Sequence, residues 1–355
     1  MSYPCIPESG YLDSPEFLKI ALHITTAIST PVHIIGIYFL LVKTPDFMKT
    51  IKWYLINLHT WIILFDYSVG ILTVPIVLLP TFAGAPFGLL RVLGVPSVVQ
   101  TLVVLSLLAY VHISDVIIFE SRFHAVCNYT GKTYWKYLRY PWIVLHYLSV
   151  LLALALFGWL TPDQKFAVEQ VLKSLPCLPD KFYSAPIFVL ADDHTWQLIL
   201  IVAFIAITSF EAVFFVGITI WSTMQKSMKK RMSPKTFQMQ KTFFTALSIQ
   251  ITVPTVMIII PMMYAWIVVV QNYHNQAWTN CMVIVTSLHG IQESKNPRIQ
   301  ESKNPRIRES KNPRIQESEN SRIREFKNPR IQESKNPRIQ ESENPGIQES
   351  KNTRS

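Results

Sequence analysis

The chain has 355 residues, of which 50% are hydrophobic and only 16% are charged. Soluble domains average about 25% charged residues, so this composition excludes an ordinary soluble domain and indicates a polytopic membrane protein. The formal net charge is +10, but the basic residues lie between apolar runs and in a tandem repeat, not on one face of a folded module. We therefore expect no nucleic-acid partner.

Six apolar runs are long enough to cross a bilayer, which takes about 20 helical residues. They are Ile20–Val42, Tyr54–Leu79, Val95–Phe119, Trp142–Leu160, Trp196–Met224 and Phe243–Val270. A seventh run, Trp278–Gly290, has 13 residues, which make about 20 Å of helix against a hydrocarbon layer of about 30 Å. The sequence therefore predicts an all-α membrane protein, a seven-transmembrane helix bundle whose seventh helix is short.

From Ile291 onward the chain repeats an eight-residue unit, IQESKNPR and its near copies, eight times. Most copies contain a Pro, which breaks helices, and the other side chains are mainly polar. Solenoid repeats need about 20 to 50 residues per unit and a recurring apolar face. We therefore predict three parts: an extracellular N-terminus over 1–17, the membrane bundle over 18–290, and a disordered repeat tail over 291–355.

Lys and Arg are distributed unequally between the connections. The first, third and fifth connections hold thirteen of them, whereas the second, fourth and sixth hold four. Because cytoplasmic segments retain positive charge, this predicts an extracellular N-terminus and, after seven crossings, a cytoplasmic C-terminus. The first 17 residues lack the features of a signal peptide, so the first helix is expected to be its own insertion signal. The cluster from Lys226 to Lys241 favours anionic membrane lipid as a partner.

Two of the four cysteines, Cys5 and Cys177, fall in segments that are predicted to be extracellular. Disulfides form in that compartment, and we predict a Cys5–Cys177 bridge that ties the N-terminal segment across the mouth of the bundle. The alternative is that the two thiols are free or differently paired, because sequence does not fix connectivity.

Ionisable residues and prolines also occur inside the apolar runs. Asp66 lies near the middle of the second run, where a charge costs about 2.5–3.5 kcal/mol on insertion scales and is usually turned inward and partnered. It is either part of an activation network or a protonated packing residue. Pro254 in the sixth run frees a backbone carbonyl and bends the helix, which suits a helix that moves. Glu211 in the fifth run is a candidate ligand contact.

The third run ends in Phe119, Glu120, Ser121, Arg122 and Phe123. An acidic residue two positions before an Arg resembles the acid-Arg-aromatic switch of rhodopsin-like receptors, in which the acid holds the Arg until the helices part. The alternative is a charged helix end at the membrane interface.

Several strings together resemble one family, the nematode chemosensory serpentine receptors of class H. They are LINLHTWIILFDYSVGILTVPIVLLP, FESRFH, LPCLP, MQKTFFTALSIQITVP and SLHG, and the resemblance covers nearly all of residues 1–290. It implies a G-protein-coupled receptor without a cofactor that detects a small odorant or pheromone. The implied location is the plasma membrane, in a sensory cilium.

The mechanism that we hypothesise begins when a bound ligand shifts the sixth helix about its prolines and Arg122 is released from Glu120. The cleft between residues 122–139 and residues 226–241, which include Lys229, Lys230 and Arg231, then admits a heterotrimeric G protein. The chain departs from the family pattern where Ile291 replaces the continuation of the seventh helix. A non-functional or misfolding relative is therefore the alternative reading.

Other classes of protein receive less support. The sequence has no HExxH and no phosphate-binding loop, so we expect neither an enzyme nor a bound metal. A transporter is a further alternative, because Asp66, Asp115 and Glu211 could line an ion path, although no internal duplication is visible.

Overall fold

The computed structural model describes residues 10–42, 49–127, 129–175, 178, 180–191, 195–224 and 256–288. All of them belong to one compact unit, Met1–Lys303. Five helical segments in this part of the chain are long and apolar enough to cross a membrane. They are α1 (Pro15–Val42), α2 (Lys49–Tyr67) with its π-helical continuation η3 (Ser68–Thr73), α4 (Ser97–Val126), α5 (Lys132–Trp159) and α8 (Thr195–Met224). The predicted helical membrane bundle is confirmed.

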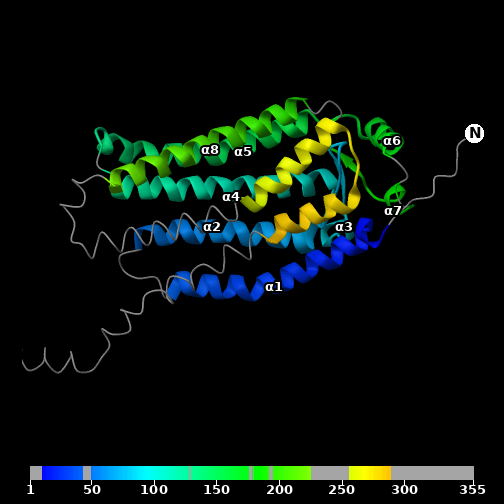
Figure 1. The fold of residues 1–355 in the computed structure, drawn as a ribbon, viewed down its shortest axis with the longest axis horizontal. Helices are drawn as coiled ribbons and strands as arrows, with labels where there is room; N and C mark the ends of the chain where they lie inside the picture. The colour runs from blue at the N-terminus through cyan, green and yellow to red at the C-terminus, as the bar shows by residue number, and fades with distance from the viewer. Residues whose placement is uncertain are drawn as a thin grey trace, which may run out of the picture. The chain divides into compact units, whose positions relative to one another are not determined.

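The long helices lie side by side and alternate in direction (Figure 1). α4 is central, because α2, α5 and α8 all pack against it, whereas α1 packs on α2 and η3. The buried core is formed mainly by apolar side chains of these helices, among them Leu22, Leu58, Ile62 and Ile118. Two ends of the bundle can be distinguished. The sheet end carries three short strands, and at the far end α4 ends at Val126 and α5 begins at Lys132.

The second predicted span is correct in its first part and wrong at its end. After η3 the chain enters β1 (Pro75–Leu78), so residues 75–79 are not helical. Pro75 has no backbone N–H and disfavours the helical conformation of the residue before it. Val74 accordingly has a φ of 44°, in the left-handed region. The helix therefore ends where the first proline of this apolar run occurs.

The third and fourth spans are longer than predicted. α4 continues to Val126, and α5 already begins at Lys132. Their added turns carry charged residues, which a search for apolar runs excludes but which are compatible with a helix end at the lipid headgroups. As a result, Glu120 lies inside α4, and Arg139, which was expected in a connection, lies on α5.

Part of the fourth connection contributes to a cap at the sheet end. β1 pairs with β2 (Ala83–Pro86), and β2 pairs with β3 (Phe188–Val189), both antiparallel. The cap also contains the short helices α3 (Leu89–Val92), α6 (Gln164–Ser174) and α7 (Asp180–Tyr183). The side-chain amide of Gln164 fixes β3, since it donates to Val189 O at 3.0 Å and accepts from Val189 N at 2.9 Å.

The last two predicted spans are described in part. An apolar helix covers Val256–Gln271, and a further helix covers 276–288. Residues 243–255 of the sixth predicted span and residues 289 and 290 of the seventh lie outside the described part of the chain. Both helices meet the sheet end, because His274 Nδ1 donates to Leu79 O at 2.6 Å and Gln276 Nε2 donates to Val77 O at 3.1 Å.

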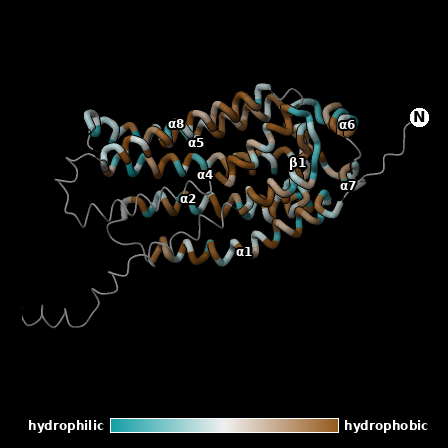
Figure 2. The backbone as a smooth tube through the Cα atoms, in the orientation of Figure 1, coloured by the Kyte–Doolittle hydropathy of each residue, from teal (hydrophilic) through white to brown (hydrophobic). Residues whose placement is uncertain are grey.

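Exposed aromatic side chains mark both ends of the bundle. On α8, Trp196 at the sheet end and Trp221 at the far end are both exposed. They are about 25 positions apart, which is about 38 Å of helix and lies between the thickness of the hydrocarbon layer and that of the whole bilayer. Trp159 and Tyr134 repeat this spacing on α5 and are also exposed. Hydrophobic residues dominate the helices between the ends (Figure 2), as in a membrane-spanning protein.

Candidate functional site

A buried ion pair connects α4 and α5 near the far end. Arg139 Nη2 donates to Glu120 Oε2 at 2.7 Å, and Trp135 Nε1 donates to Glu120 Oε1 at 2.7 Å. The Glu120 side chain is fully buried and that of Arg139 is 10% exposed. The same Nη2 also donates to the hydroxyl of Tyr54 on α2 at 3.2 Å. The Glu120 carboxylate therefore joins α4 to α5, and Arg139 extends the link to α2. These four residues, Glu120, Trp135, Arg139 and Tyr54, are called the Glu120 cluster.

These contacts differ from the predicted Glu120–Arg122 pair. Both oxygens of Glu120 accept hydrogen bonds from α5, and residues two apart on a helix do not face each other. The cation that bonds to Glu120 among the described contacts is Arg139, which follows on α5. A switch role for Glu120 and for Arg122 stays a prediction, now with Arg139 as the cation that Glu120 holds.

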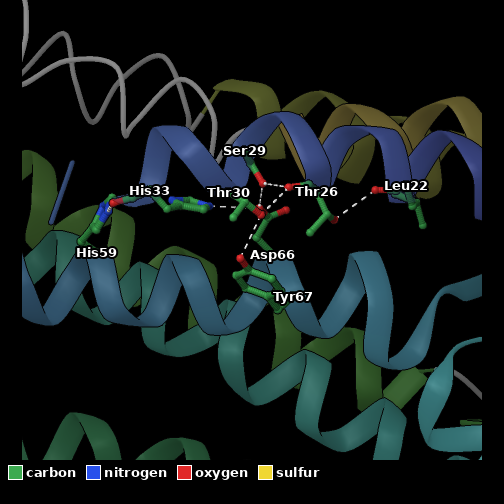
Figure 3. Close-up of polar contacts among 8 residues, drawn as sticks. All are labelled: Leu22, Thr26, Ser29, Thr30, His33, His59, Asp66 and Tyr67. Atoms are coloured by element: carbon green, nitrogen blue, oxygen red, sulfur yellow. Dashed lines mark hydrogen bonds and ion pairs between the residues drawn. The ribbon is translucent and has the colours of Figure 1, made fainter. Parts of the chain in front are cut away.

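Asp66 forms a second buried centre, between α1 and α2 (Figure 3). His33 Nε2 donates to Asp66 Oδ2 at 3.0 Å, and the hydroxyl of Ser29 donates to the same oxygen. His59 Nε2 in turn donates to the backbone oxygen of His33 at 3.2 Å. Beside this centre, the hydroxyls of Thr30 and Tyr67 lie 2.9 Å apart. Asp66 is therefore turned inward and partnered, as predicted for a charge in a span.

Glu211 pairs with a histidine of a neighbouring helix. His146 Nε2 on α5 donates to Glu211 Oε2 on α8 at 2.8 Å, and Trp142 Nε1 is 3.4 Å from Glu211 Oε1. Both oxygens of this candidate ligand contact are thus already engaged by α5. The two side chains are 12% and 21% exposed, so the pair lies at the edge of the bundle.

A neutral network joins α2, α4 and α5 between these charged centres. The side-chain amide of Asn57 donates to Ser114 Oγ and to the hydroxyl of Tyr147, both at 2.9 Å. The ring of Tyr147 packs near those of Trp61 and Tyr110, with centroids 6.2 and 5.3 Å away. Hydrogen bonds between buried polar side chains are a common means of fixing helix contacts in a membrane.

Several buried polar atoms lack a hydrogen-bond partner in the described part of the chain. Those toward the sheet end include Ser68 Oγ and Thr73 Oγ1 on η3, Gln100 Oε1 on α4, Gln197 Oε1 on α8 and Gln276 Oε1 at the start of the last helix. Such atoms are costly unless water or a ligand bonds to them. They are the described groups most available to a polar ligand.

A shallow hollow of about 330 Å³ also lies at the sheet end, where Ser97, Gly158, Gln164 and Phe188 contribute to its lining. Its polar side chains are engaged, because Ser97 Oγ donates to Pro186 O at 2.9 Å and Gln164 bonds to β3. The hollow therefore offers mainly apolar contact.

Several predicted site residues lie outside the described part of the chain. They are Cys5, Cys177, Lys229, Lys230, Arg231 and Pro254. The predicted disulfide and the predicted basic coupling surface therefore stay predictions. Among the described residues, Cys127 and Cys281 are free thiols, and no group of three or more His, Cys, Asp or Glu could hold a metal ion.

The partners of the buried acids were missed by the sequence analysis. His33 and His146 each occur inside an apolar run, and an ionisable residue in a membrane span calls for a named partner. That rule would have singled out both histidines. It would not have matched them to Asp66 and Glu211, because the pairing depends on which helices are neighbours.

The long apolar helices and the two aromatic belts define a multi-pass membrane protein of the helical-bundle class. A family model described as "Serpentine type 7TM GPCR chemoreceptor Srh" matches residues 13–295. The chain therefore belongs to this family of serpentine chemoreceptors. A curated relative, "Serpentine receptor class H-72" of Caenorhabditis elegans, is 26% identical over 263 residues, which are 73% of this chain and 76% of the relative. No solved structure matches the chain.

Proposed function

We propose that the chain is a chemosensory receptor that binds a small environmental molecule and activates a heterotrimeric G protein. Membership of a chemoreceptor family supports this proposal. The observation that carries it is the Glu120 cluster, in which one buried carboxylate holds α2, α4 and α5 together near the far end. A buried ion pair that spans helices is suited to hold one of two helix arrangements.

The proposed orientation places the N-terminus outside the cell and the far end in the cytoplasm. Most Lys and Arg of the connections belong to the first, third and fifth connections, which follow the helices α1, α4 and α8 that run toward the far end. Two of them also bond to helix ends there: Lys52 Nζ donates to Leu41 O and Lys132 Nζ donates to Cys127 O, both at 2.8 Å. In this orientation, the plasma membrane of a sensory cilium presents the sheet end to environmental molecules.

We assign the ligand to the interior of the bundle near the sheet end. The unpartnered atoms of Thr73, Gln100 and Gln276 support this assignment, because a small molecule with a hydrogen-bond donor would satisfy them. The ligand needs only a higher affinity for the active arrangement than for the inactive one. Glu211 is a poorer candidate than it was from sequence, since His146 and Trp142 occupy its oxygens.

The test is basal G-protein activation, which needs no known ligand. The chain is expressed in membranes with each of several heterotrimers, and nucleotide exchange is measured. Glu120→Gln weakens the link to Arg139 and is expected to raise basal exchange, whereas Arg122→Ala is expected to lower it. Lys165→Gln, at an exposed site of α6, is the matched control and should change nothing. Unchanged exchange in both site variants, with normal surface levels, would refute the switch.

Surface level and orientation are measured in the same cells. A glycosylation sequon inserted before residue 10 is modified only if the N-terminus is outside the cell. A chain in which a complete seventh helix replaces residues 291–355 is compared with the chain as it stands. Equal surface levels support a folded receptor, and loss of surface expression only in the repeat-bearing chain supports the alternative of a misfolding relative.

A further inference from the structure

The first two turns of α5 form an exposed surface rich in lysine and tyrosine. Tyr134, Tyr137 and Tyr140 are 77%, 71% and 62% exposed, and Lys136 is exposed between them. Lys136, Tyr137 and Tyr140, together with the half-exposed Lys132, are called the Lys-Tyr face. Tyr134 lies on the other side of the same helix turns. Lys132, Lys136 and Tyr140 follow one another at intervals of four, so they lie along one line of the helix.

The positive charge of the Lys-Tyr face has no acidic counterpart on α5. No Asp or Glu occurs between Cys127 and Trp159. Glu120 on α4 is neutralised by Arg139, and the ring of His124 lies within the electrostatic reach of Lys132 and Lys136. Two lysines four apart on a helix repel each other. A bound anion would relieve that repulsion, and the protein supplies none in its described part.

The tyrosines place this face at the level of the lipid headgroups. Tyr134 lies about 38 Å of helix from the exposed Trp159 at the other end of α5. Tyrosine prefers the membrane interface, where its ring contacts the acyl chains and its hydroxyl reaches the polar layer. The exposed Leu138 adds apolar contact beside Tyr134 and Tyr137. At this depth the aromatic rings can contact the acyl chains of a lipid while the ammonium groups contact its charged headgroup.

We propose that the Lys-Tyr face binds the headgroup of an anionic phospholipid. The ammonium group of Lys136 pairs with its phosphate oxygens, and Lys132 adds the N–H groups that it does not use for Cys127 O. The hydroxyls of Tyr137 and Tyr140 donate hydrogen bonds to the same oxygens. That the lipid belongs to the cytoplasmic leaflet rests on the proposed orientation, but the binding itself does not. An anionic lipid seated here would hold the start of α5, and with it Arg139 of the Glu120 cluster.

The test is lipid retention by the purified full chain, measured by native mass spectrometry in detergent. Phosphatidylinositol 4,5-bisphosphate is the anionic probe and phosphatidylcholine the neutral one. Each lysine near an anionic headgroup contributes enough to change affinity about fivefold. Lys132→Gln/Lys136→Gln should therefore retain the anionic lipid about 25-fold more weakly, with phosphatidylcholine unaffected. Lys165→Gln/Lys173→Gln on α6 removes the same charge at the sheet end and should retain it as the wild type does.

Other outcomes separate the alternatives. Lys136→Arg conserves the charge and should keep full retention, which excludes a folding defect as the cause of a loss. Equal retention by all variants overturns the proposal, and so does an equal loss in the α6 control. If soluble inositol hexakisphosphate competes as well as the lipid, the face is a site for a free polyphosphate instead. If lipid retention is unchanged while G-protein activation falls, the face belongs to the G protein. Lipid retention is measured without a ligand or G protein, so it can be interpreted even if the receptor proposal fails.

Discussion

Replacement of Glu120 is the sharpest test of the far-end contacts. In Glu120→Gln the amide oxygen can still accept from Trp135, but Arg139 loses its counter-charge while it stays buried. Removing one partner of a buried ion pair costs about 3–5 kcal/mol, because the remaining charge is uncompensated. We expect the lower value, about 3 kcal/mol, since Tyr54 still accepts one hydrogen bond from Arg139. For a bundle of this size that corresponds to a fall in Tm of about 6 °C or more.

The assay is thermal unfolding of the purified chain in one detergent, with the double variant Glu120→Gln/Arg139→Gln included. In the double variant no charge is left buried, so most of the loss should be recovered, with a coupling free energy of about 2 kcal/mol. The control is Glu169→Gln, which breaks the pair with Lys173 on α6, where both side chains are exposed, and should leave Tm unchanged. If Glu120→Gln unfolds like this control, or if the two single effects simply add, the reasoning is refuted.

Three further predictions concern other contacts. In Gly70→Ala the new Cβ would lie 1.8 Å from Thr26 Oγ1, so overpacking should cost about 1–3 kcal/mol, measured by thermal unfolding. Thr26→Ala should rescue part of it, and no rescue would contradict the clash. Burial raises the pKa of the Cys127 thiol, which keeps the thiol protonated. The alkylation rate of Cys127 should therefore rise only at a higher pH than in the unfolded chain, and identical pH profiles of the folded and unfolded chains would contradict this. Glu211→Gln should lower Tm less than Glu120→Gln, because the His146 pair is more exposed; a larger loss would contradict that ranking.

The sequence predicted the features that depend on local composition. The apolar runs located the membrane helices, because hydrophobic length alone decides whether a segment can span. The end of α2 could also have been predicted from the sequence, since Pro75 lies inside the run TVPIVLLP. The extra turns of α4 and α5 were missed because charged residues at helix ends interrupt an apolar run without ending the helix.

The contacts of the candidate site could not be predicted in the same way. Glu120 is two positions from Arg122 but pairs with Arg139, nineteen positions away. Asp66 pairs with His33 because α1 and α2 are neighbours, and nothing in either run specifies that. In such cases sequence spacing identifies a group that needs a partner, while the packing of the helices selects the partner.

Three paired acids suggest which part of the bundle can move. Asp66 ties α1 to α2 and Glu120 ties α4 to α5, and Tyr54 extends the second link to α2. α8 is tied to α5 by Glu211 alone among the described acids. Beyond Glu211, toward the far end, α8 meets α4 through apolar and aromatic contacts, such as Phe123 against Phe215 with centroids 5.4 Å apart, and through the thiol of Cys127, which donates to Ile218 O at 3.9 Å. Such contacts can slide without leaving a charge unpaired, whereas the acid-base links cannot. We therefore expect activation to move the far end of α8 about the Glu211 pair while α1, α2, α4 and α5 stay together. The distance between spin labels at positions 53 and 221 should then change on activation, and an unchanged distance would exclude this movement.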